Sequence, residues 1–521
     1  MNDEFSVSLR WGDWLIVALY LVGILGLSVW SKLSKKQDTE EYLIARKSMN
    51  WVIVSLAVFA TLFSTVSFVS VPGEAYNQGL MLMFFGFAPI LFLPLAIWLF
   101  LRFFFMAPTF TAYEYLEKRF SRANRVLAAL FFVILRLSYL GCVFYATSII
   151  FQSLVGWPPL WTILAVGAMT VLYGYLGGVR AVILADVVQS IIIFCAITVI
   201  LFFLLRLTHF DIGAVLAFAH KNNHTFETFA DPNFYRINVH DRWCFWVMAL
   251  GLVVGPLTSL SCDQMVVQRL LAGKNYRSAV RSVYTNYLIS IPVITMLYGI
   301  GLILYYYYNA GGAVLPHGVK GDQVLGYFIN STLPSPLSGL VVAGLLSALM
   351  STVAGGVNSI VTVLLKDIVT MLQPKIVGTN KEMTWCHILT VLVGFFAIFV
   401  ALIMTILGER VKTTVIEVIG VWGALWGVLL CVFLYGVTSV RVSERAIFVS
   451  TCISGCVALV FPYIVYYGLP EGERWGYAWV GLPPLFVALL LPPLLSYLWP
   501  NKKNLDGLTI HTTGNFLKAN R

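Results

Sequence analysis

Charged residues are scarce in this chain of 521 residues. Asp, Glu, Lys and Arg together make up 11% of it, whereas 59% of the residues are hydrophobic. Soluble domains carry roughly a quarter charged residues, so the composition leaves little material for a water-soluble body. The longest hydrophilic stretch, residues 208–242, is too short to form a soluble domain. We therefore expect a protein that is embedded in a lipid bilayer.

The sequence motifs of several enzyme classes are also missing. There is no GxxxxGK[ST] phosphate-binding loop, so direct drive by ATP is not supported. There is no HExxH motif and no His and Cys cluster with the spacing of a metal site. All eight cysteines fall inside apolar stretches without a CxxC pattern, and we expect thiols in the protein core rather than disulfides. These absences predict that the protein is not an enzyme.

Long apolar stretches, in contrast, are abundant. A helix needs about 20 apolar residues to cross a hydrocarbon core about 30 Å thick. The sequence therefore predicts an all-α polytopic membrane protein with about 13 transmembrane helices. The expected spans are residues 12–31, 50–73, 79–106, 124–154, 158–177, 181–207, 243–262, 282–308, 336–366, 386–408, 413–437, 446–468 and 476–499. Residues 1–500 would form a single transmembrane domain, and residues 501–521 a cytoplasmic tail.

The net charge of +10 is distributed unevenly between the predicted loops. Alternate loops carry most of the Lys and Arg, for example Lys35, Arg122 and Arg277, and the opposite short loops have few. Because such loops face the cytoplasm, we expect the N-terminus outside and the C-terminus in the cytoplasm. The charge then needs no nucleic acid, and no obligate protein partner is inferred. We expect a multi-pass protein in contact with the lipid bilayer of the plasma membrane, in this case a bacterial inner membrane.

Two of the predicted spans look broken. The second, residues 50–73, interrupts its apolar run with several hydroxyl residues around Ser64, and the seventh, residues 243–262, contains Gly-Pro at Pro256. These spans are five apart, as expected for two five-helix repeats of opposite orientation. Unwound backbone in such helices supplies binding sites near the bilayer midplane. The alternative for each span is a kink or a hydroxyl bonded to its own helix, without a binding role.

The ninth span contains a candidate cation site. Ala348 and Ser351 share one helical face, and Thr352 lies beside them. A carbonyl and two hydroxyls directed at one point are neutral oxygen ligands, which suit Na⁺ without a buried carboxylate. The alternative is a face of small residues that serves helix packing.

Three of the charged residues inside predicted spans are candidates for a functional site. Arg136 is costly at that depth, and its planar guanidinium fits a carboxylate, either of a solute or of an acid on another helix. Asp186 either pairs with Arg180 or guides a leaving cation. Glu417 either lines the transport pathway or faces solvent near Lys412. For each of these three residues, the spacing in the sequence does not decide between the two alternatives.

A succession of motifs gives the sequence its family resemblance. It consists of residues 59–64, 72–76, 111–120 (TAYEYLEKRF), 175–178 with 185–189, 263–269 and 351–368. In this order the motifs resemble the sodium:solute symporter family, which includes sodium-coupled carriers of sugars, sialic acid, proline and monocarboxylates. The YEYLEKRF run is the most specific of them. The resemblance implies two inverted five-helix repeats, about 50–207 and 243–437, with one helix before them and two after.

The resemblance also implies a function and a sodium site. Members of the family carry out Na⁺-coupled symport of a small polar organic solute by alternating access, with Na⁺ as the coupling ion. The implied ligands are the backbone carbonyls of Ala60, Phe63 and Ala348 and the hydroxyls of Ser351 and Thr352. Asp186 matches an acid that helps to release sodium. Members equipped for a second sodium have hydroxyl residues where this chain has Ala354 and Gly355, so we expect one Na⁺ per cycle.

The substrate positions that the resemblance implies are less specific. Hydroxyls that remain able to bind a solute belong to Ser64, Thr65 and Ser67. Sugar carriers place polar groups where this chain has Leu62, Phe85 and Gly86, which disfavours a hexose. Sialic acid carriers place a carboxylate-binding arginine where Tyr139 stands here, and Arg136 is about one helical turn away. We therefore expect an anionic or zwitterionic solute such as sialic acid or a monocarboxylate. The alternative function is an uncoupled solute channel or sensor with the same fold.

Overall fold

The computed structural model describes residues 9–34, 38–105, 109–241, 243–310, 313–316, 319, 321–411 and 415–512. Over these ranges the chain is helical and has no β-strand; its only ladder contact is an isolated bridge between Met49 and Gly273. The predicted all-α class is confirmed for this part of the chain.

The helices follow one another with short connections. In chain order they are α1 (Trp11–Ser34), α2 (Thr39–Ile44), α3 (Trp51–Leu62), α4 (Thr65–Gln78), α5 (Met81–Phe87), α6 (Leu93–Ala96), α7 (Arg102–Phe105), α8 (Tyr113–Arg119), α9 (Arg122–Val155), α10 (Pro159–Leu207), α11 (Ile212–Lys221), α12 (Phe245–Ser261), α13 (Gln264–Leu271), α14 (Tyr276–Asn309), α15 (Gly321–Thr332), α16 (Leu337–Val363), α17 (Thr370–Leu372), α18 (Asn380–Val411), α19 (Val415–Thr438), α20 (Glu444–Tyr463), α21 (Tyr477–Val480) and α22 (Leu482–Leu498).

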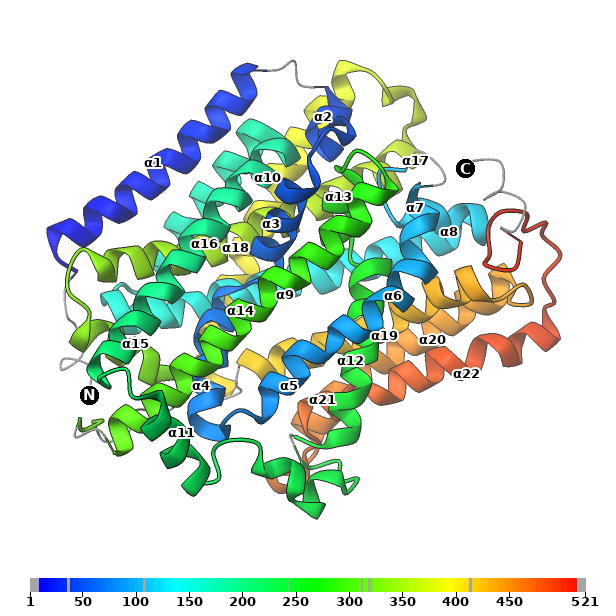
Figure 1. The fold of residues 1–521 in the computed structure, drawn as a ribbon. Helices are drawn as coiled ribbons and strands as arrows, with labels where there is room; N and C mark the ends of the chain where they lie inside the picture. The colour runs from blue at the N-terminus through cyan, green and yellow to red at the C-terminus, as the bar shows by residue number, and fades with distance from the viewer. Residues whose placement is uncertain are drawn as a thin grey trace.

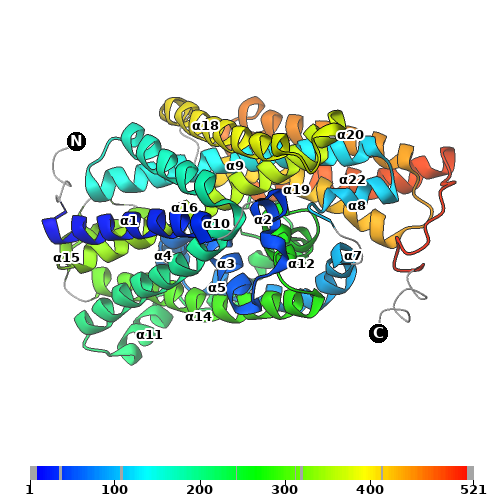
Figure 2. The same ribbon diagram turned by 90° about the horizontal axis from the view of Figure 1, so that it is seen from above.

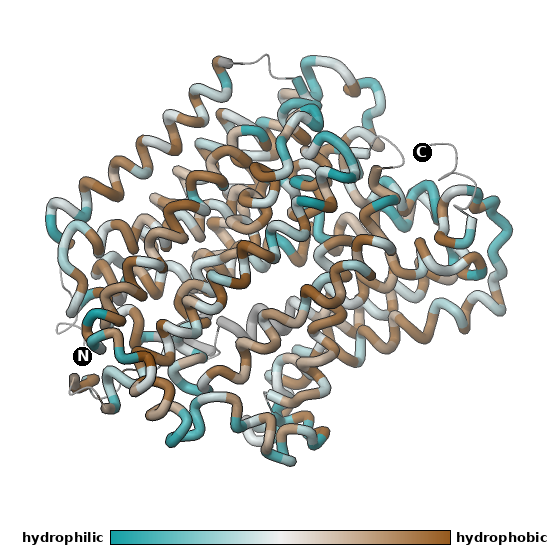
Figure 3. Tube along the Cα trace, viewed as in Figure 1, coloured by the Kyte–Doolittle hydropathy of each residue, from teal (hydrophilic) through white to brown (hydrophobic). Residues whose placement is uncertain are grey.

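The long helices run alongside one another in a single bundle (Figure 1). Helix α1 lies at one edge, α20 and α22 lie at the other, and α9, α10 and α16 lie between them in both views (Figures 1 and 2). Apolar residues cover the lengths of the helices, while hydrophilic residues gather at the two ends of the bundle (Figure 3). Among the described residues, nine helices are long and apolar enough to cross a membrane, or eleven if each of two bent pairs is one span. The bundle is therefore a multi-pass membrane protein.

Helix α10 contains a sharp turn at Gly178. The element has 49 residues, more than twice the roughly 20 that cross a bilayer, and Gly178 in its interior has a φ of +58°. A Cβ atom at this position would lie 2.6 Å from the ring of Tyr42. Both the left-handed backbone and the close ring require glycine here. The turn separates residues 158–177 from 181–207, which the sequence predicts as two spans.

The two bent pairs are α3 with α4, at 66°, and α12 with α13, at 52°. Sequence reasoning identified both broken spans, but the position near Pro256 is wrong for the second. Helix α12 continues through Pro256 to Ser261, and proline is tolerated inside membrane-spanning helices. The break comes at Asp263, whose carboxylate accepts the N–H of Met265 at 3.0 Å and so begins a new helix.

Helix α16 forms the centre of the bundle. Nearly all of its residues from Ser338 to Val363 are buried. The carboxylate of Asp13 in α1 accepts the hydroxyl of Ser338 and the N–H of Gly339, each at 2.8 Å, which fixes the start of α16. One hydrophobic core cluster extends over the bundle. The described part of the predicted tail also packs, since Tyr115 donates to the carbonyl of Leu508 at 2.7 Å.

Candidate functional site

The break between α3 and α4 leaves backbone carbonyls without helical partners. Helix α3 ends at Leu62, so the carbonyls of its last turn lack the N–H groups that a continuing helix would supply. Two of them meet hydroxyls of α16 instead. The Ser351 hydroxyl donates to the carbonyl of Ala60 at 2.8 Å, and the Thr352 hydroxyl donates to that of Thr61 at 3.3 Å. The end of one helix thus faces the middle of another.

Ser351 is surrounded by more acceptors than it can satisfy. Its Oγ lies 2.8 Å from the carbonyl oxygen of Ser347 and 3.2 Å from that of Ala348, in addition to Ala60. A hydroxyl has one proton to donate, so three carbonyls cannot all receive it at once. Ala60, Ala348 and Ser351 are fully buried. A small hard cation is held by oxygens of this kind, and the negative end of the α3 dipole favours it.

The other two predicted sodium ligands lie beside this cluster. Thr352 is one residue further along α16 and contacts the next carbonyl of α3. Phe63 lies at the break itself, with an extended backbone (φ −87°, ψ 97°) and its N–H bonded to the carbonyl of Phe59 at 2.9 Å. Its ring packs on those of Phe59 and Phe68, at centroid distances of 5.5 and 6.1 Å. All five predicted ligands therefore come from the break in α3–α4 or the facing part of α16.

Asp186 of α10 lies next to this cluster, with Arg269 of α13 as its partner. Asp186 Oδ2 accepts from Nε and Nη2 of Arg269 at 3.1 and 2.8 Å, and from the hydroxyl of Thr61 at 3.3 Å. Both members of the ion pair are buried. The pairing with Arg180 left open by the sequence is not formed, because Arg180 binds Glu41 at 3.0 Å.

Arg269 is the residue that sequence reasoning missed. It lies 83 positions from Asp186, and spacing carries no signal for such a contact. Its guanidinium runs along Gly355, where a Cβ atom would lie 2.7 Å from Nη2. Gly355 therefore leaves room for the fixed positive charge of Arg269. The sequence had linked this glycine to the absence of a second sodium site.

Arg136 of α9 forms a buried ion pair with Asp263, the residue that caps α13 at the second break. The distance between Nη2 and Oδ1 is 2.5 Å. The guanidinium also lies 5.3 Å from the ring centroids of Tyr139 and Trp426. Its Nε is buried and has no hydrogen-bond partner among the described residues. The pair with an acid on another helix is formed, and one donor of the guanidinium is still uncommitted.

The predicted substrate hydroxyls differ in their environments. Ser64 caps α4, with its Oγ 3.3 Å from both the N–H and the Oγ of Ser67, and Tyr139 lies close to Ser64. Thr65 is buried and donates to the carbonyl of Leu345 in α16 at 3.2 Å. Ser64, Ser67 and Tyr139 therefore lie together, whereas the Thr65 hydroxyl already serves helix packing.

Phe85 and Gly86 of α5 have apolar neighbours. The Phe85 ring joins an aromatic cluster with the rings of Phe229 and Phe245, at centroid distances of 6.2 and 6.4 Å. A Cβ atom at Gly86 would lie 3.2 Å from Ile294 of α14. The side chain of Glu417 lies outside the residues whose side chains the structure describes.

The described ranges contain no group of three His, Cys, Asp or Glu residues that could hold a metal ion. The eight cysteines are free, and five of them are buried.

Comparisons with known proteins show which sequences the chain resembles. The sequence model of the sodium:solute symporter family matches residues 42–454. A putative sodium-dependent multivitamin transporter of Drosophila melanogaster is 27% identical over 88% of this chain and 75% of its own length. A sodium/sialic acid symporter of Proteus mirabilis is 24% identical over 85% of this chain and 88% of its own length. These relatives are transporters.

One solved structure is similar over almost the whole chain. It is that of a Na⁺-coupled sialic acid symporter in a substrate-bound outward-open state, with a TM-score of 0.85 and 21% sequence identity. It covers 95% of this chain and 99% of its own. The similarity supports the fold described above.

Proposed function

Because this chain belongs to the sodium:solute symporter family, we propose that it couples uptake of a small polar organic solute to one Na⁺ per cycle by alternating access. Sodium-coupled transport is the shared activity of the symporters it resembles. The stoichiometry, the solute and the conformational cycle are our proposals, and each rests on particular residues.

The observation that carries the proposal is the meeting of Ser351 with the carbonyls of Ala60 and Ala348. These oxygens come from two helices that are far apart in the sequence, so an ion between them ties α16 to the broken helix. Ion binding favours whichever conformation brings the oxygens together, and only a difference in affinity between two conformations drives a cycle. Phe63 and Thr352 are proposed to complete the coordination.

A single sodium follows from the charge of Arg269. The carboxylate nearest to the site, Asp186, is already neutralised by this fixed cation, so it has no need of a second ion. We propose that Asp186 guides sodium toward the cytoplasm, through Thr61, which contacts both the carboxylate and Thr352. One ion is enough: a charge crossing 100 mV gains roughly 2.3 kcal/mol, and a tenfold gradient adds about 1.4 kcal/mol. Together these concentrate a neutral solute by roughly several hundredfold.

The solute is proposed to be anionic or zwitterionic, for example sialic acid or a monocarboxylate. Relatives are named as sodium/sialic acid symporters and as sodium-coupled monocarboxylate transporters. In this chain the uncommitted Nε of Arg136 is a donor for a carboxylate. The hydroxyls of Ser64, Ser67 and Tyr139 lie together as further donors. Phe85 and Gly86 would supply apolar wall rather than sugar contacts.

The proposed architecture has thirteen spans in one domain. The eleven spans counted with each bent pair as one become thirteen when α10 is divided at Gly178 and α19 is included. The two bent pairs then occupy the first positions of inverted repeats at about 50–207 and 243–437, with one helix before and two after. In this proposal the protein lies in the plasma membrane, with its N-terminus outside the cell and its C-terminus in the cytoplasm.

Transport by purified protein in proteoliposomes tests this function. Radiolabelled N-acetylneuraminic acid and small monocarboxylates are offered in parallel, with an inward gradient of either sodium or choline. We expect at least one solute to accumulate above its outside concentration with sodium only. Equilibration without accumulation in both salts would instead indicate the uncoupled channel.

A further inference from the structure

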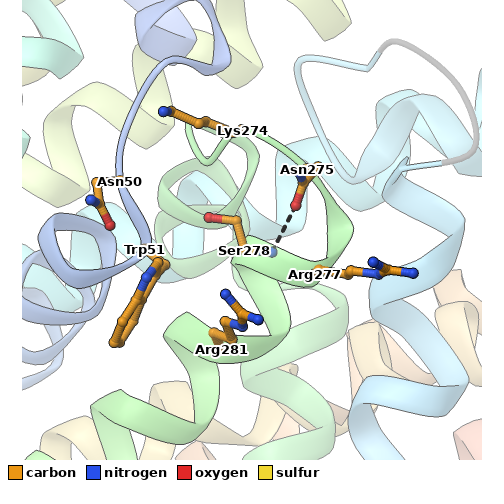
Figure 4. A pocket seen from close by; sticks show the side chains of 7 residues that line it. All are labelled: Asn50, Trp51, Lys274, Asn275, Arg277, Ser278 and Arg281. Carbon is orange, nitrogen blue, oxygen red and sulfur yellow. Dashed lines mark hydrogen bonds between the residues drawn. The ribbon is translucent and has the colours of Figure 1, made fainter.

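A cavity with a basic lining lies between the starts of α3 and α14. It has a volume of about 330 Å³ and is built around Lys274, Arg277 and Arg281, together with Asn50 and Trp51 at the start of α3 (Figure 4). It is separate from the sodium site, which lies at the far end of α3, after Ala60. None of the residues in the proposed transport pathway lines it.

The two walls of the cavity are fastened to each other. The isolated bridge between Met49 and Gly273 joins the segments that precede the two helices, with the Met49 N–H bonded to the carbonyl of Ala272 at 3.0 Å. One turn further on, the hydroxyl of Ser282 donates to the carbonyl of Trp51 at 3.0 Å. The cavity is therefore a fixed feature of the fold rather than a gap between independent loops.

The charges around the cavity are unbalanced. Three cations line it, and no carboxylate does. Two half-buried cations elsewhere are neutralised: Arg125 binds Asp367 at 2.6 Å, and Lys366 binds Glu382 at 2.6 Å. Within the described part of the chain, Lys274, Arg277 and Arg281 form no ion pair or side-chain hydrogen bond, and all three are exposed. Like charges gathered in one concave site attract an anion from outside.

Backbone N–H groups at the two helix starts add further hydrogen-bond donors with partial positive charge. Asn50 caps α3 and accepts the N–H of Val52 at 3.1 Å. Asn275 caps α14 and accepts the N–H of Ser278 at 2.9 Å (Figure 4). The remaining N–H groups of both first turns have no helical acceptor. The Arg281 guanidinium lies toward Trp51 and Ser278 at the two helix starts, whereas that of Arg277 points away from them (Figure 4). The ligand that fits this combination is an oxyanion such as phosphate.

The depth of the cavity indicates where that phosphate comes from. Helices α3 and α14 begin candidate membrane spans, and the cavity is lined by Trp51, the first residue of α3, and by residues of the first turns of α14. Aromatic residues at span ends lie at the level of lipid headgroups. Helix starts at this level, with basic residues between spans, meet the phosphate of anionic lipids. We propose that this cavity binds the phosphate headgroup of an anionic phospholipid in the leaflet that the basic loops face.

Native mass spectrometry of the purified full chain in detergent tests the proposal. The probe is phosphatidylglycerol, compared with phosphatidylcholine of the same chain length. The test variant combines Lys274→Gln, Arg277→Gln and Arg281→Gln, and the control combines Lys375→Gln, Lys381→Gln and Arg441→Gln, which removes the same charge from exposed residues elsewhere. We expect wild type and control to hold phosphatidylglycerol roughly tenfold or more tightly than the test variant.

Two results would overturn the proposal. Equal phosphatidylglycerol affinity in the test variant and the wild type would show that the cavity is not the site. Displacement of the lipid by a matched concentration of inorganic phosphate would show that the cavity takes free phosphate instead. If the triple variant is not stable, the single variants Lys274→Gln and Arg281→Gln replace it, and each is expected to weaken binding by a smaller factor. Phosphatidylcholine is expected to bind all variants equally.

Discussion

At the scale of single residues, the proposed sodium site depends on several carbonyl oxygens that surround one hydroxyl. Ser351 offers one proton to three buried carbonyls. The carbonyls of Ser347 and Ala348 already accept N–H groups within α16, and the carbonyl of Ala60 accepts the Ser351 hydroxyl. Each carbonyl oxygen has a second lone pair with which it can coordinate a sodium ion. Asp186, the nearest acid, is paired with Arg269, so neutral oxygens carry the coordination. This division explains why a cation can bind here reversibly.

Removing the two hydroxyls of the site should weaken sodium binding. In the variant Ser351→Ala with Thr352→Ala, we expect the sodium concentration for half-maximal uptake to rise roughly tenfold or more. A hydrogen bond or ligand contact to a charged group contributes about 1.5–3 kcal/mol, and 1.4 kcal/mol corresponds to about tenfold. Sodium titration of uptake in proteoliposomes measures the change.

Ser359→Ala is the matched control for that variant. Ser359 is also a fully buried serine of α16, and its hydroxyl donates to the carbonyl of Gly356 at 2.8 Å, away from α3. Its sodium dependence should equal that of the wild type. If the double variant titrates like the control, the ligand assignment is wrong.

The Arg136–Asp263 pair allows structural and substrate roles to be separated. Loss of one partner leaves a buried charge uncompensated and should cost about 3–5 kcal/mol of stability, so Arg136→Gln and Asp263→Asn should each lower the melting temperature. The double variant should regain most of that stability. Uptake of an anionic solute should not recover in it, because the donor for the carboxylate is still missing. Recovery of both properties would make Arg136 purely structural.

At the scale of helices, the proposed site is formed by breaks within the membrane-spanning helices rather than by the loops between them. The break after Leu62 exposes the carbonyls that form the site, and the break at Asp263 places Arg269 next to Asp186. The turn at Gly178 reverses the chain so that Asp186, eight positions later, returns toward α3. The three interruptions bring the site together from separate parts of the sequence.

Gly178→Ala tests the turn in α10. An alanine in the left-handed region costs about 1–2 kcal/mol, and its Cβ would also overlap the Tyr42 ring. We expect a clear fall in the melting temperature of the purified protein. Gly174→Ala, one turn earlier in the same helix, has open space at its Cβ and should be neutral or slightly stabilising. Equal melting temperatures for both variants would contradict the account of the turn.

The elements were largely predictable from the sequence, and their interruptions were predictable in part. Apolar length predicts the spans because the bilayer fixes the length of a helix. The hydroxyl-rich run around Ser64 pointed to the first break correctly. Pro256 was misleading because packed helices tolerate proline, whereas the helix-capping signal at Asp263 marked the actual break. A helix-capping residue is a local signal, and here Asp263 was a stronger indication of the break than Pro256.

At the scale of the whole molecule, contacts between distant residues were the unpredictable part. The family resemblance placed Ala60 and Ser351 together, 291 positions apart. Nothing in the spacing of residues connects Arg269 with Asp186, or Arg136 with Asp263. Such pairs depend on how whole helices face each other, and that is decided by packing of the entire bundle. The same limit applies to the proposed lipid cavity, whose lining comes from the starts of two helices that are far apart in the sequence.

The proposed stoichiometry predicts the electrical behaviour of the transporter. With one Na⁺ per solute, uptake of a zwitterion moves one net charge, and uptake of a monoanion moves none. Parallel measurement of ²²Na⁺ and labelled solute in proteoliposomes should give a ratio near one for either. A membrane potential, negative inside, should accelerate only zwitterion uptake. A current carried with a monoanion would require a second ion and would contradict the role given to Arg269.

Direct binding of ²²Na⁺ to the purified protein tests the central claim without knowledge of the solute. Scintillation proximity measurements on wild type, Ser359→Ala and the Ser351→Ala/Thr352→Ala variant compare the number and affinity of bound ions. The account predicts one saturable site per chain in the first two proteins and its loss or strong weakening in the third. Unchanged sodium binding by the folded double variant would contradict it.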